Sequence, residues 1–308
     1  MRIYQFYQLD VFTNNAFTGN SLAVFPDPMG LSSDEMQTIA REMNLSETVF
    51  VLNSEKALRH LRIFTPTQEL PMAGHPVVGT WNLLARLGIV QAVENGWTQI
   101  QQEIGIGVLP VDIEYHNNLP IQVVMTQGKF EIGDVISDNN MILRLAESLG
   151  LQITDFDLEL LPIQVVSTGI KSLAVCVKSL EKLGECRINS SLLSEIYLEF
   201  GAIGCYAFTL ETLEGNPSRA HARFFAPDDG ISEDPATGSA AGALSSYLVY
   251  HGAIDTVENI AKFTIEQGDF MKRPSRIFAE ITGKKGNIEK VKIGGNSVVV
   301  AKGEVFFD

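Results

Sequence analysis

An internal repeat is the most constraining feature of this 308-residue sequence, because stretches roughly 150 to 160 residues apart carry the same motifs in the same order. Residues 18–24 read TGNSLAV, a turn that leads into an apolar strand. Residues 168–175 read TGIKSLAV and repeat this pattern with one residue added. A duplication of this length predicts two related domains, each long enough to bury its own core.

A second pair of motifs follows in each half. Residues 62–66, RIFTP, lead to 71–75, PMAGH, and then to an apolar helical pattern. In the second half, RFFAP leads to PATGS at 235–239 and to a similar helical pattern. Because order and content both match, chance is a poor explanation, and the repeat indicates a duplicated architecture.

Each half is expected to contain one helix that is buried on nearly all sides. The first is predicted over 75–87, with a proline in its first turn and Gly88 as a stop signal. Its counterpart, predicted over 239–251 before Gly252, begins with small residues that indicate close approach by neighbouring backbone.

Short runs of β-branched and aromatic residues predict strands around these helices, at 48–51, 121–125, 163–166 and 297–300. Amphipathic helices are expected over 34–43, capped by Ser32 or Ser33, and over 141–149. The sequence therefore predicts an α+β protein in which each half is a curved sheet wrapped around one buried helix.

Composition narrows the classes of function. Apolar residues make up 45% of the chain, which is typical of a globular protein, and the formal net charge is −14. Nucleic acid is therefore not an expected partner, because binding to phosphates comes mainly from basic side chains. No signal peptide or run of about 18 apolar residues is present, so a cytoplasmic protein without a membrane partner is expected.

The cysteine pattern favours structural thiols, with metal binding as the weaker alternative. Cys176, Cys186 and Cys205 are odd in number, far apart, and lack the spacing that holds zinc. They are expected to be small buried thiols.

The two helix starts are the first candidate binding elements. The first turn of a helix leaves backbone N–H groups without partners and carries partial positive charge, so a carboxylate is favoured there. If the ends that begin at Gly74 and Gly238 face one cleft, small carboxylic acids are the natural ligands. The alternative is that the two glycines merely allow tight turns.

Ionisable residues that suit acid–base chemistry lie around the same junctions. They are Glu69 and His75 in the first half and Glu233 and Asp234 in the second. Histidine titrates near neutrality and burial can move a carboxylate toward the same range, so proton transfer needs no cofactor or metal here. Glu47 is a further candidate at a strand start, where an exposed structural role is the alternative.

Together these motifs resemble the phenazine-biosynthesis PhzF-like isomerase family across nearly the whole chain. The residues that carry the resemblance are 10–13, 19–25, 45–50, 64–66, 73–80, 233–242, 267–268, 273–275 and 293–295. The resemblance implies the diaminopimelate-epimerase-like fold, with two domains related by pseudo-two-fold duplication, each a rolled, mostly antiparallel sheet around a central helix. It implies an N-terminal domain of 1–126 joined by the C-terminal strand 296–308, and a C-terminal domain of 127–295.

The resemblance also implies roles for individual positions. Glu47 matches the glutamate that takes a proton from one carbon and returns it to another, and His75 and Asp234 match residues that assist proton relay. The positions that match substrate-binding groups are Asn20, Gly74, Thr237, Gly238 and Ser239. Related epimerases of diaminopimelate and proline place cysteines at these two junctions, where this sequence has Ala73 and Thr237. Chemistry centred on Glu47 is therefore expected in place of a two-thiol mechanism.

Two other functions remain open from the sequence. One is a racemase or epimerase of an amino or hydroxy acid, which the same helix ends and acid–base groups would serve. The other is a small-acid-binding protein that has lost turnover, although this sequence retains the glutamate and the histidine. A cofactor-independent isomerase, with a homodimer as the candidate assembly, is the expected function.

Overall fold

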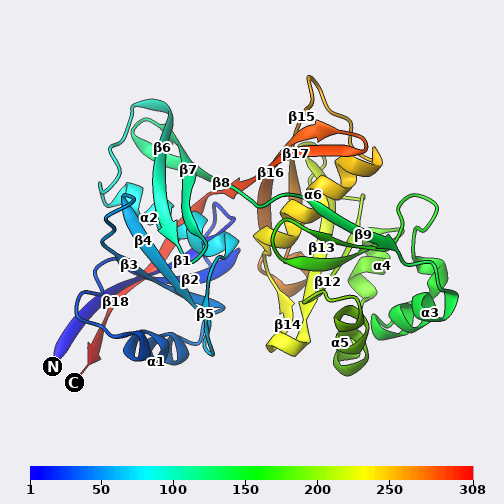
Figure 1. The fold of residues 1–308 in the computed structure, drawn as a ribbon, viewed down its shortest axis with the longest axis horizontal. Helices are drawn as coiled ribbons and strands as arrows, with labels where there is room; N and C mark the ends of the chain where they lie inside the picture. The colour runs from blue at the N-terminus through cyan, green and yellow to red at the C-terminus, as the bar shows by residue number, and fades with distance from the viewer. Residues whose placement is uncertain (308) are drawn as a thin grey trace. The chain divides into compact units, whose positions relative to one another are not determined.

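The computed structural model describes residues 1–307 and confirms the expected α+β class (Figure 1). The chain divides into two compact units. Unit 1 holds Met1–Thr126 and the chain from Gly294 onward, and unit 2 holds Gln127–Ile293. Each unit has its own strands, its own central helix and its own hydrophobic core.

The sheet of unit 1 is mostly antiparallel. Its strands follow one another in the order β18 (Ser297–Phe307), β1 (Arg2–Val11), β2 (Asn20–Phe25), β3 (Glu47–Leu52), β4 (Arg59–Phe64), β6 (Asn95–Ile104), β7 (Gly107–His116) and β8 (Leu119–Thr126). Only β2 with β3 and β4 with β6 pair in parallel, and the short β5 (Glu69–Leu70) returns along β4.

Helix α2 (Gly74–Arg86) is the central helix of unit 1, and every residue from His75 to Ala85 is buried. Its close contact with the sheet depends on Gly79, because a Cβ there would lie 2.6 Å from the Leu22 side chain. The indole of Trp81 donates a hydrogen bond of 2.7 Å to Gln102 on β6. The amphipathic helix α1 (Ser33–Met43) packs on the outside of the same sheet, as expected.

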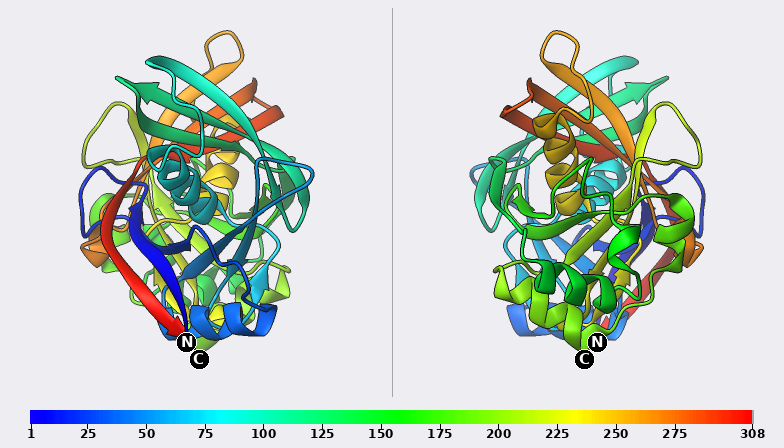
Figure 2. Two further views of the ribbon diagram at one scale, coloured as in Figure 1. Left: turned by 90° about the vertical axis from the view of Figure 1, so that its left-hand side faces the viewer. Right: turned by 90° about the vertical axis from the view of Figure 1, so that its right-hand side faces the viewer.

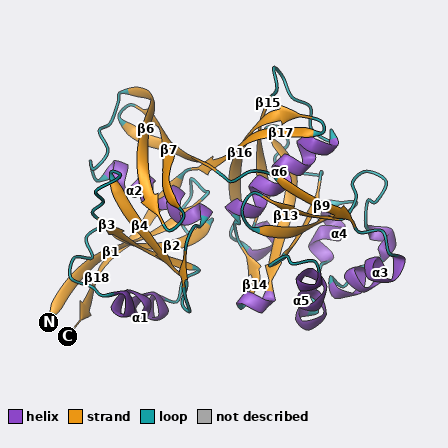
Figure 3. Ribbon diagram, in the orientation of Figure 1, coloured by secondary structure: helices purple, strands orange, loops and turns teal. Residues whose placement is uncertain are grey.

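Unit 2 repeats this plan. Its strands are β9 (Glu131–Val135), β10 (Gln164–Ser167), β11 (Lys171–Cys176), β12 (Cys205–Thr209), β13 (Ser218–Ala226), β14 (Ile231–Asp234), β15 (Ile260–Gln267), β16 (Ser275–Lys284) and β17 (Asn287–Gly295). Its helices are α3 (Asn139–Ser148), α4 (Leu180–Glu185), α5 (Ser190–Glu199) and α6 (Gly238–His251), with short 3-10 helices η1 (Ile153–Asp155), η2 (Pro227–Asp229) and η3 (Asp269–Met271). In Figure 3, α6 lies against the strands of its own unit as α2 does in unit 1.

The two units also repeat the pairing register of their strands, and no sequence motif had indicated this. In unit 1, β4 and β6 pair in parallel with His60 opposite Glu103. In unit 2, β13 and β15 pair in parallel with His221 opposite Glu266. The equivalent strand pairs β2–β3 and β11–β12 are also parallel. Corresponding residues therefore occupy corresponding sheet positions in the two halves.

Two further expectations concern the whole chain. Cys176, Cys186 and Cys205 are free and buried, as expected. Among residues 1–307, no helix combines the length and the apolar character that crossing a membrane requires.

Candidate active site

The N-terminus of α2 is open in the sense that no side chain caps it. Its N-cap is Ala73, whose side chain offers no acceptor, and its first turn contains no acidic residue. The N–H groups of that turn are therefore not neutralised by the helix's own side chains, and they present partial positive charge.

The N-terminus of α6 in unit 2 has the same character. Its N-cap is Thr237, which makes no side-chain capping hydrogen bond, and no acidic residue lies in its first turn. The first helical backbone bond runs from the Ala241 N–H to the Thr237 carbonyl at 2.9 Å.

The other α-helices have side-chain caps at their N-termini. Side chains accept a hydrogen bond from the first turn in α1, α3, α4 and α5, at Ser32, Asp138, Ser179 and Asn189 respectively. Within residues 1–307, α2 and α6 are the two α-helices without such a cap. Capping is the common way to satisfy these groups, and α2 and α6 do without it.

Glu47 and His75 are brought together in unit 1. Glu47 is the first residue of β3, and His75 lies in the first turn of α2. The His75 Nε2 lies 3.1 Å from the Glu47 Oε2, and their side chains are 7% and 15% exposed. The imidazole also hydrogen-bonds to the backbone of Ser21. Burial lowers the pKa of His75 to about 3, so the ring is neutral at pH 7.

Asn20 lies beside this pair in the sheet. It is the first residue of β2, is buried, and accepts a hydrogen bond of 3.4 Å from the hydroxyl of Ser46, the residue before Glu47. The parallel register of β2 and β3 places Leu22 opposite Glu47. The sheet therefore holds Asn20 and Glu47 on neighbouring strand ends.

In unit 2, the Asp234 carboxylate is tied to the α6 N-terminus. Asp234 ends β14 and is 8% exposed, and its carboxylate accepts a hydrogen bond from the Thr237 hydroxyl. This hydrogen bond therefore links the orientation of the Asp234 carboxylate to the N-cap residue of α6. Gly238 and Ser239 are the first two residues of the helix.

Gln267, which the sequence analysis did not identify as a site residue, connects these groups. Its amide donates to the Asp234 carbonyl at 2.7 Å and to the Thr237 hydroxyl at 3.1 Å. Its Oε1 accepts from the Thr237 N–H at 3.1 Å and from the Tyr206 hydroxyl at 2.7 Å. Gln267 is fully buried, so no water replaces these bonds. The Gln267-Gly268 motif was the only signal of its importance in the sequence.

A second buried glutamine braces the first turn of α6 from another side. Gln127 donates to the Gly238 carbonyl at 3.0 Å and accepts from the Thr168 hydroxyl at 2.6 Å. Gly242 makes room for it, because a Cβ there would lie 1.9 Å from the Gln127 Oε1. The small residues of α6 therefore allow a polar side chain to reach the helix start.

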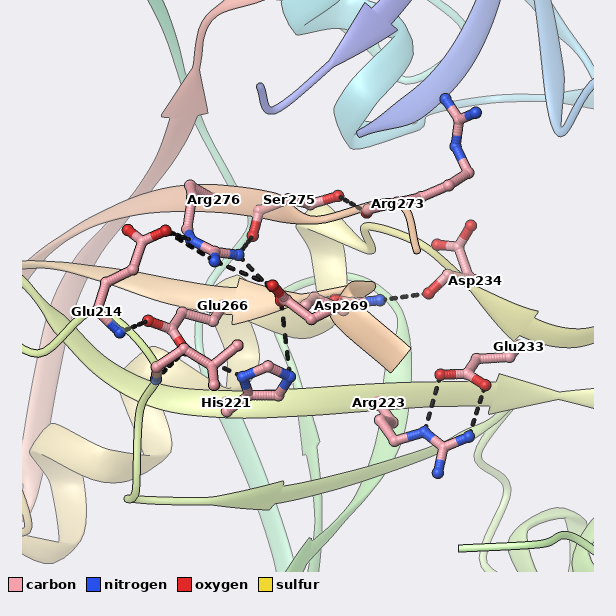
Figure 4. A network of polar contacts seen from close by, with 12 residues as sticks. Glu214, His221, Arg223, Glu233, Asp234, Glu266, Asp269, Arg273, Ser275 and Arg276 are labelled. Carbon is pink, nitrogen blue, oxygen red and sulfur yellow. Dashed lines mark hydrogen bonds and ion pairs between the residues drawn. The ribbon is translucent and has the colours of Figure 1, made fainter. Parts of the chain in front are cut away.

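Glu69 and Glu233, proposed from sequence as acid–base partners, are instead engaged by arginines. Arg62 holds the Glu69 carboxylate with bonds of 2.7 and 2.6 Å. Arg223 holds Glu233 with bonds of 2.8 and 2.7 Å, as the paired dashed lines in Figure 4 show. A bidentate arginine fixes a carboxylate in place, which suits a structural role.

Figure 4 also shows a polar network around His221, which includes Glu266 and Asp269, the near neighbours of Gln267 in the sequence. The His221 Nδ1 lies 3.0 Å from Glu266, and its Nε2 lies 3.7 Å from Asp269, which Arg276 binds through two bonds of 3.0 Å. Hydrogen bonds from His221 and two backbone N–H groups hold the pKa of Glu266 at about 2, although burial opposes them. This network fixes the strand end from which Gln267 extends.

The three cysteines are removed from this chemistry. Burial raises the pKa of Cys176 to about 12 and that of Cys186 to about 11, and it raises the pKa of Cys205 further. The thiolate, which is the reactive form, is therefore disfavoured at all three positions. None of them lies in the first turn of α2 or α6.

Comparison with known proteins gives consistent results over the full chain. The sequence model of the family described as phenazine biosynthesis-like protein matches residues 9–303. An uncharacterized isomerase of Clostridium acetobutylicum is 38% identical, with 99% of each chain covered. The trans-2,3-dihydro-3-hydroxyanthranilate isomerase of Pseudomonas chlororaphis is 33% identical, with 98% of this chain and 99% of that one covered. The crystal structure of a PhzF-family phenazine biosynthesis protein of Bacillus anthracis has a TM-score of 0.90 at 29% identity, covering all of both chains.

Proposed function

Since the chain belongs to the family of phenazine biosynthesis-like proteins and is an isomerase, we propose that it moves a proton between two carbons of a small carboxylic acid. The proposed reaction is general acid–base catalysis centred on Glu47. The observation that carries this proposal is the buried contact of 3.1 Å between Glu47 and His75 beside an uncapped helix end.

In the proposed reaction, the Glu47 carboxylate takes a proton from one carbon, and the electron pair of the broken C–H bond moves into the adjoining unsaturated system. The protonated Glu47 then delivers this proton to a second carbon, and the carboxylate is regenerated. No atom or electron is gained or lost overall, so the chemistry needs neither a redox group nor a metal.

The neutral His75 supports both steps. The His75 Nε2 lies 3.1 Å from the Glu47 Oε2 without hydrogen-bond geometry, and a small reorientation would let an uncharged imidazole bond either form of the carboxyl group. A charged imidazolium would hold Glu47 as a permanent carboxylate and weaken it as a base. The burial that lowers the pKa of His75 therefore favours a glutamate that both accepts and donates a proton.

The substrate carboxylate is proposed to bind the open helix ends. Backbone N–H groups at Gly74 and Gly238 would hold its oxygens, with Asn20, Thr237 and Ser239 as side-chain contacts. Negative charge that develops during proton removal would be stabilised by the same donors. Asp234 would assist the relay, because its carboxylate is already shared with the Thr237 hydroxyl.

A racemase or epimerase acting on an amino or hydroxy acid is the second candidate, because open helix ends would serve it equally. The burial and high pKa of all three cysteines weigh against its two-thiol form.

The test is proton exchange in heavy water, followed by NMR, over a panel of cyclic and acyclic carboxylic acids that includes trans-2,3-dihydro-3-hydroxyanthranilate. An isomerase yields a shifted double bond with deuterium at the new carbon. A racemase yields deuterium at one carbon with loss of optical purity. Binding of an acid to calorimetric saturation without proton exchange in that acid would contradict the proposed reaction for it.

A further inference from the structure

Asp10 is a buried carboxylate that the reaction proposed above does not use. It lies next to the last residue of β1 and is 1% exposed. Its backbone pairs with Ser21 of β2 on one side and with Val298 of β18 on the other. In the left view of Figure 2, β1 in blue lies beside β18 in red. Because strands hold this residue on both sides, its carboxylate extends from a fixed backbone.

The Asp10 carboxylate binds groups on either side of Asn20. Its Oδ2 accepts a hydrogen bond of 2.6 Å from the Phe17 N–H, and its Oδ1 accepts one of 3.3 Å from the Ser21 hydroxyl. Asp10 and Ser21 lie directly opposite each other in the antiparallel pair, so their side chains share one face of the sheet. One carboxylate therefore holds the backbone three residues before Asn20 and the side chain of the residue after it.

The loop over 12–19, which joins β1 to β2, depends on such support. Phe12 and Phe17 have left-handed backbone, with φ of 62° and 66°, and this conformation is unfavourable for bulky residues. Residues in such conformations persist only where their surroundings hold them. The Phe12 N–H donates to the Asn296 carbonyl at 2.9 Å. The Phe17 ring is 75% exposed, so the hydrogen bond to Asp10, and not packing of the ring, holds this end of the loop.

Two candidate site residues are attached to the segment that Asp10 holds. Asn20 lies directly before Ser21, and the His75 imidazole hydrogen-bonds to the Ser21 backbone. Ser21 thus connects the Asp10 carboxylate to the ring whose Nε2 lies 3.1 Å from Glu47. A shift of the 17–21 segment would therefore move Asn20 and change the support of His75.

We propose that Asp10 is a positioning residue of the isomerase site. It acts through its hydrogen bonds to the Phe17 N–H and the Ser21 hydroxyl. These bonds set the orientation of Asn20 and His75, and a substrate then meets both groups already in place. The effect on the reaction rests on the function proposed above for Asn20 and His75, whereas the effect on the loop does not.

The experiment compares Asp10→Leu with Asp10→Asn. Leucine has nearly the shape of aspartate but accepts no hydrogen bond. Asparagine can accept from the Phe17 N–H through its oxygen and donate to the Ser21 hydroxyl through its NH2 group. In the proton-exchange assay, Asp10→Leu is expected to lower kcat/KM by about 10- to 100-fold, with a higher KM and a lower kcat, because a displacement of about 1 Å can cost this much. Asp10→Asn is expected to stay close to the parent in both constants.

Two NMR measurements on the same variants do not depend on activity. Amide hydrogen exchange over residues 12–21 reports on the loop, and the ring nitrogen signals of His75 report on its support. Both should change in Asp10→Leu and remain like the parent in Asp10→Asn. Gln102→Met is the matched control, because it removes a buried hydrogen bond of 2.7 Å to Trp81 elsewhere in unit 1. It should leave the loop, the His75 signals and KM unchanged.

Ser21→Ala is a milder variant that serves if Asp10→Leu does not fold. It removes one of the two hydrogen bonds and should change the loop and the His75 signals in the same direction, but less. Unchanged signals and parent kinetics in a folded Asp10→Leu, or in Ser21→Ala in its place, overturn the proposal. Losses of the same size in Asp10→Asn and Asp10→Leu also overturn it, because the two bonds would then not carry the effect.

Failure of the proposed function gives a different result. A parent that exchanges no proton with any acid contradicts that function, and the loop and His75 signals then decide the positioning role alone. A parent that is active and an Asp10→Leu variant that matches it contradict the positioning role and leave the proposed function intact.

Discussion

The Nε2 of His75 and the Oε2 of Glu47 lie 3.1 Å apart, although the two residues come from a helix and a strand that are separated by 21 residues of sequence between β3 and α2. The contact is shielded, since both side chains are at least 85% covered. The protonation states of Glu47 and His75 therefore depend mainly on each other and on a bound ligand, because water has little access to the pair. The first two predictions concern this pair.

Glu47→Gln should separate binding from turnover. The amide keeps the shape of the side chain but cannot accept a proton from carbon, so turnover should fall about 10² to 10⁴-fold while affinity changes little. Calorimetry and proton exchange by NMR on the same protein measure both. Ser239→Ala is the comparison, because losing one polar contact should cost about 0.5 to 3 kcal/mol in affinity and rate together. Exchange at the parent rate in Glu47→Gln would move the base to His75 or Asp234.

The burial of His75 should make folding sensitive to pH. The pKa of the folded state is about 3, whereas that of an unfolded histidine is about 6.5, so between these values the unfolded state binds more protons. The free energy of unfolding should therefore fall as the pH drops from about 6.5 toward about 3. His75→Gln lacks this titration, and urea unfolding at several pH values should show a shallower decline. Parallel curves for the two proteins would show that His75 is not buried as a neutral group.

Gln267→Met should loosen the start of α6. The variant removes four hydrogen bonds and leaves the Thr237 N–H and the Asp234 carbonyl without this partner, which should cost about 1 to 3 kcal/mol in unfolding free energy. Amide hydrogen exchange in residues 234–240 should accelerate. Gln102→Met is the matched control, because Gln102 is equally buried but binds Trp81 in unit 1. Equal acceleration in both variants would contradict a specific role for Gln267.

The two arginine–glutamate pairs should differ in their contribution to stability. Arg223→Leu leaves the Glu233 carboxylate, 14% exposed, without its partner and also removes bonds to the Leu183 and Cys186 carbonyls, so a loss of about 3 to 5 kcal/mol is expected. Arg62→Leu leaves Glu69, which is 42% exposed and can turn to solvent, and should cost about 1 kcal/mol or less. Denaturant unfolding measures both losses, and equal values would refute this ranking.

The sequence predicted the central helices well, because local signals define them. Gly88 and Gly252 marked the ends of α2 and α6, and the small residues after Gly238 indicated the tight packing that Gly242 confirms. The expected α1 is also present, with Ser32 as its N-cap. Helix α4 was missed because six residues give weak periodicity, and α5 was missed because its apolar residues, which include Leu192, Leu193 and Leu198, do not form one clear stripe.

The candidate site was only partly predictable for a physical reason. Motifs near each glycine identified His75 and Asp234, but hydrogen bonds across 30 or more residues leave no local pattern. Gln267 reaches Thr237 over 30 positions, and Gln127 reaches Gly238 over 111. The same limit explains why Glu69 and Glu233 were first interpreted as acid–base groups. The meeting of the two helix ends at one substrate stays a prediction.

The open helix ends also bear on how long the protein survives in a cell. A side-chain cap stabilises a helix by about 1 kcal/mol at all times, and α2 and α6 forgo it. Under the proposed function, an acid bound there would act as the missing cap and would add about 2.7 kcal/mol when its concentration is 100 times its dissociation constant. Proteases act on the unfolded fraction, so degradation should slow when the metabolite is abundant and quicken when it is scarce. Supply of substrate would then set the amount of enzyme without any change in its synthesis.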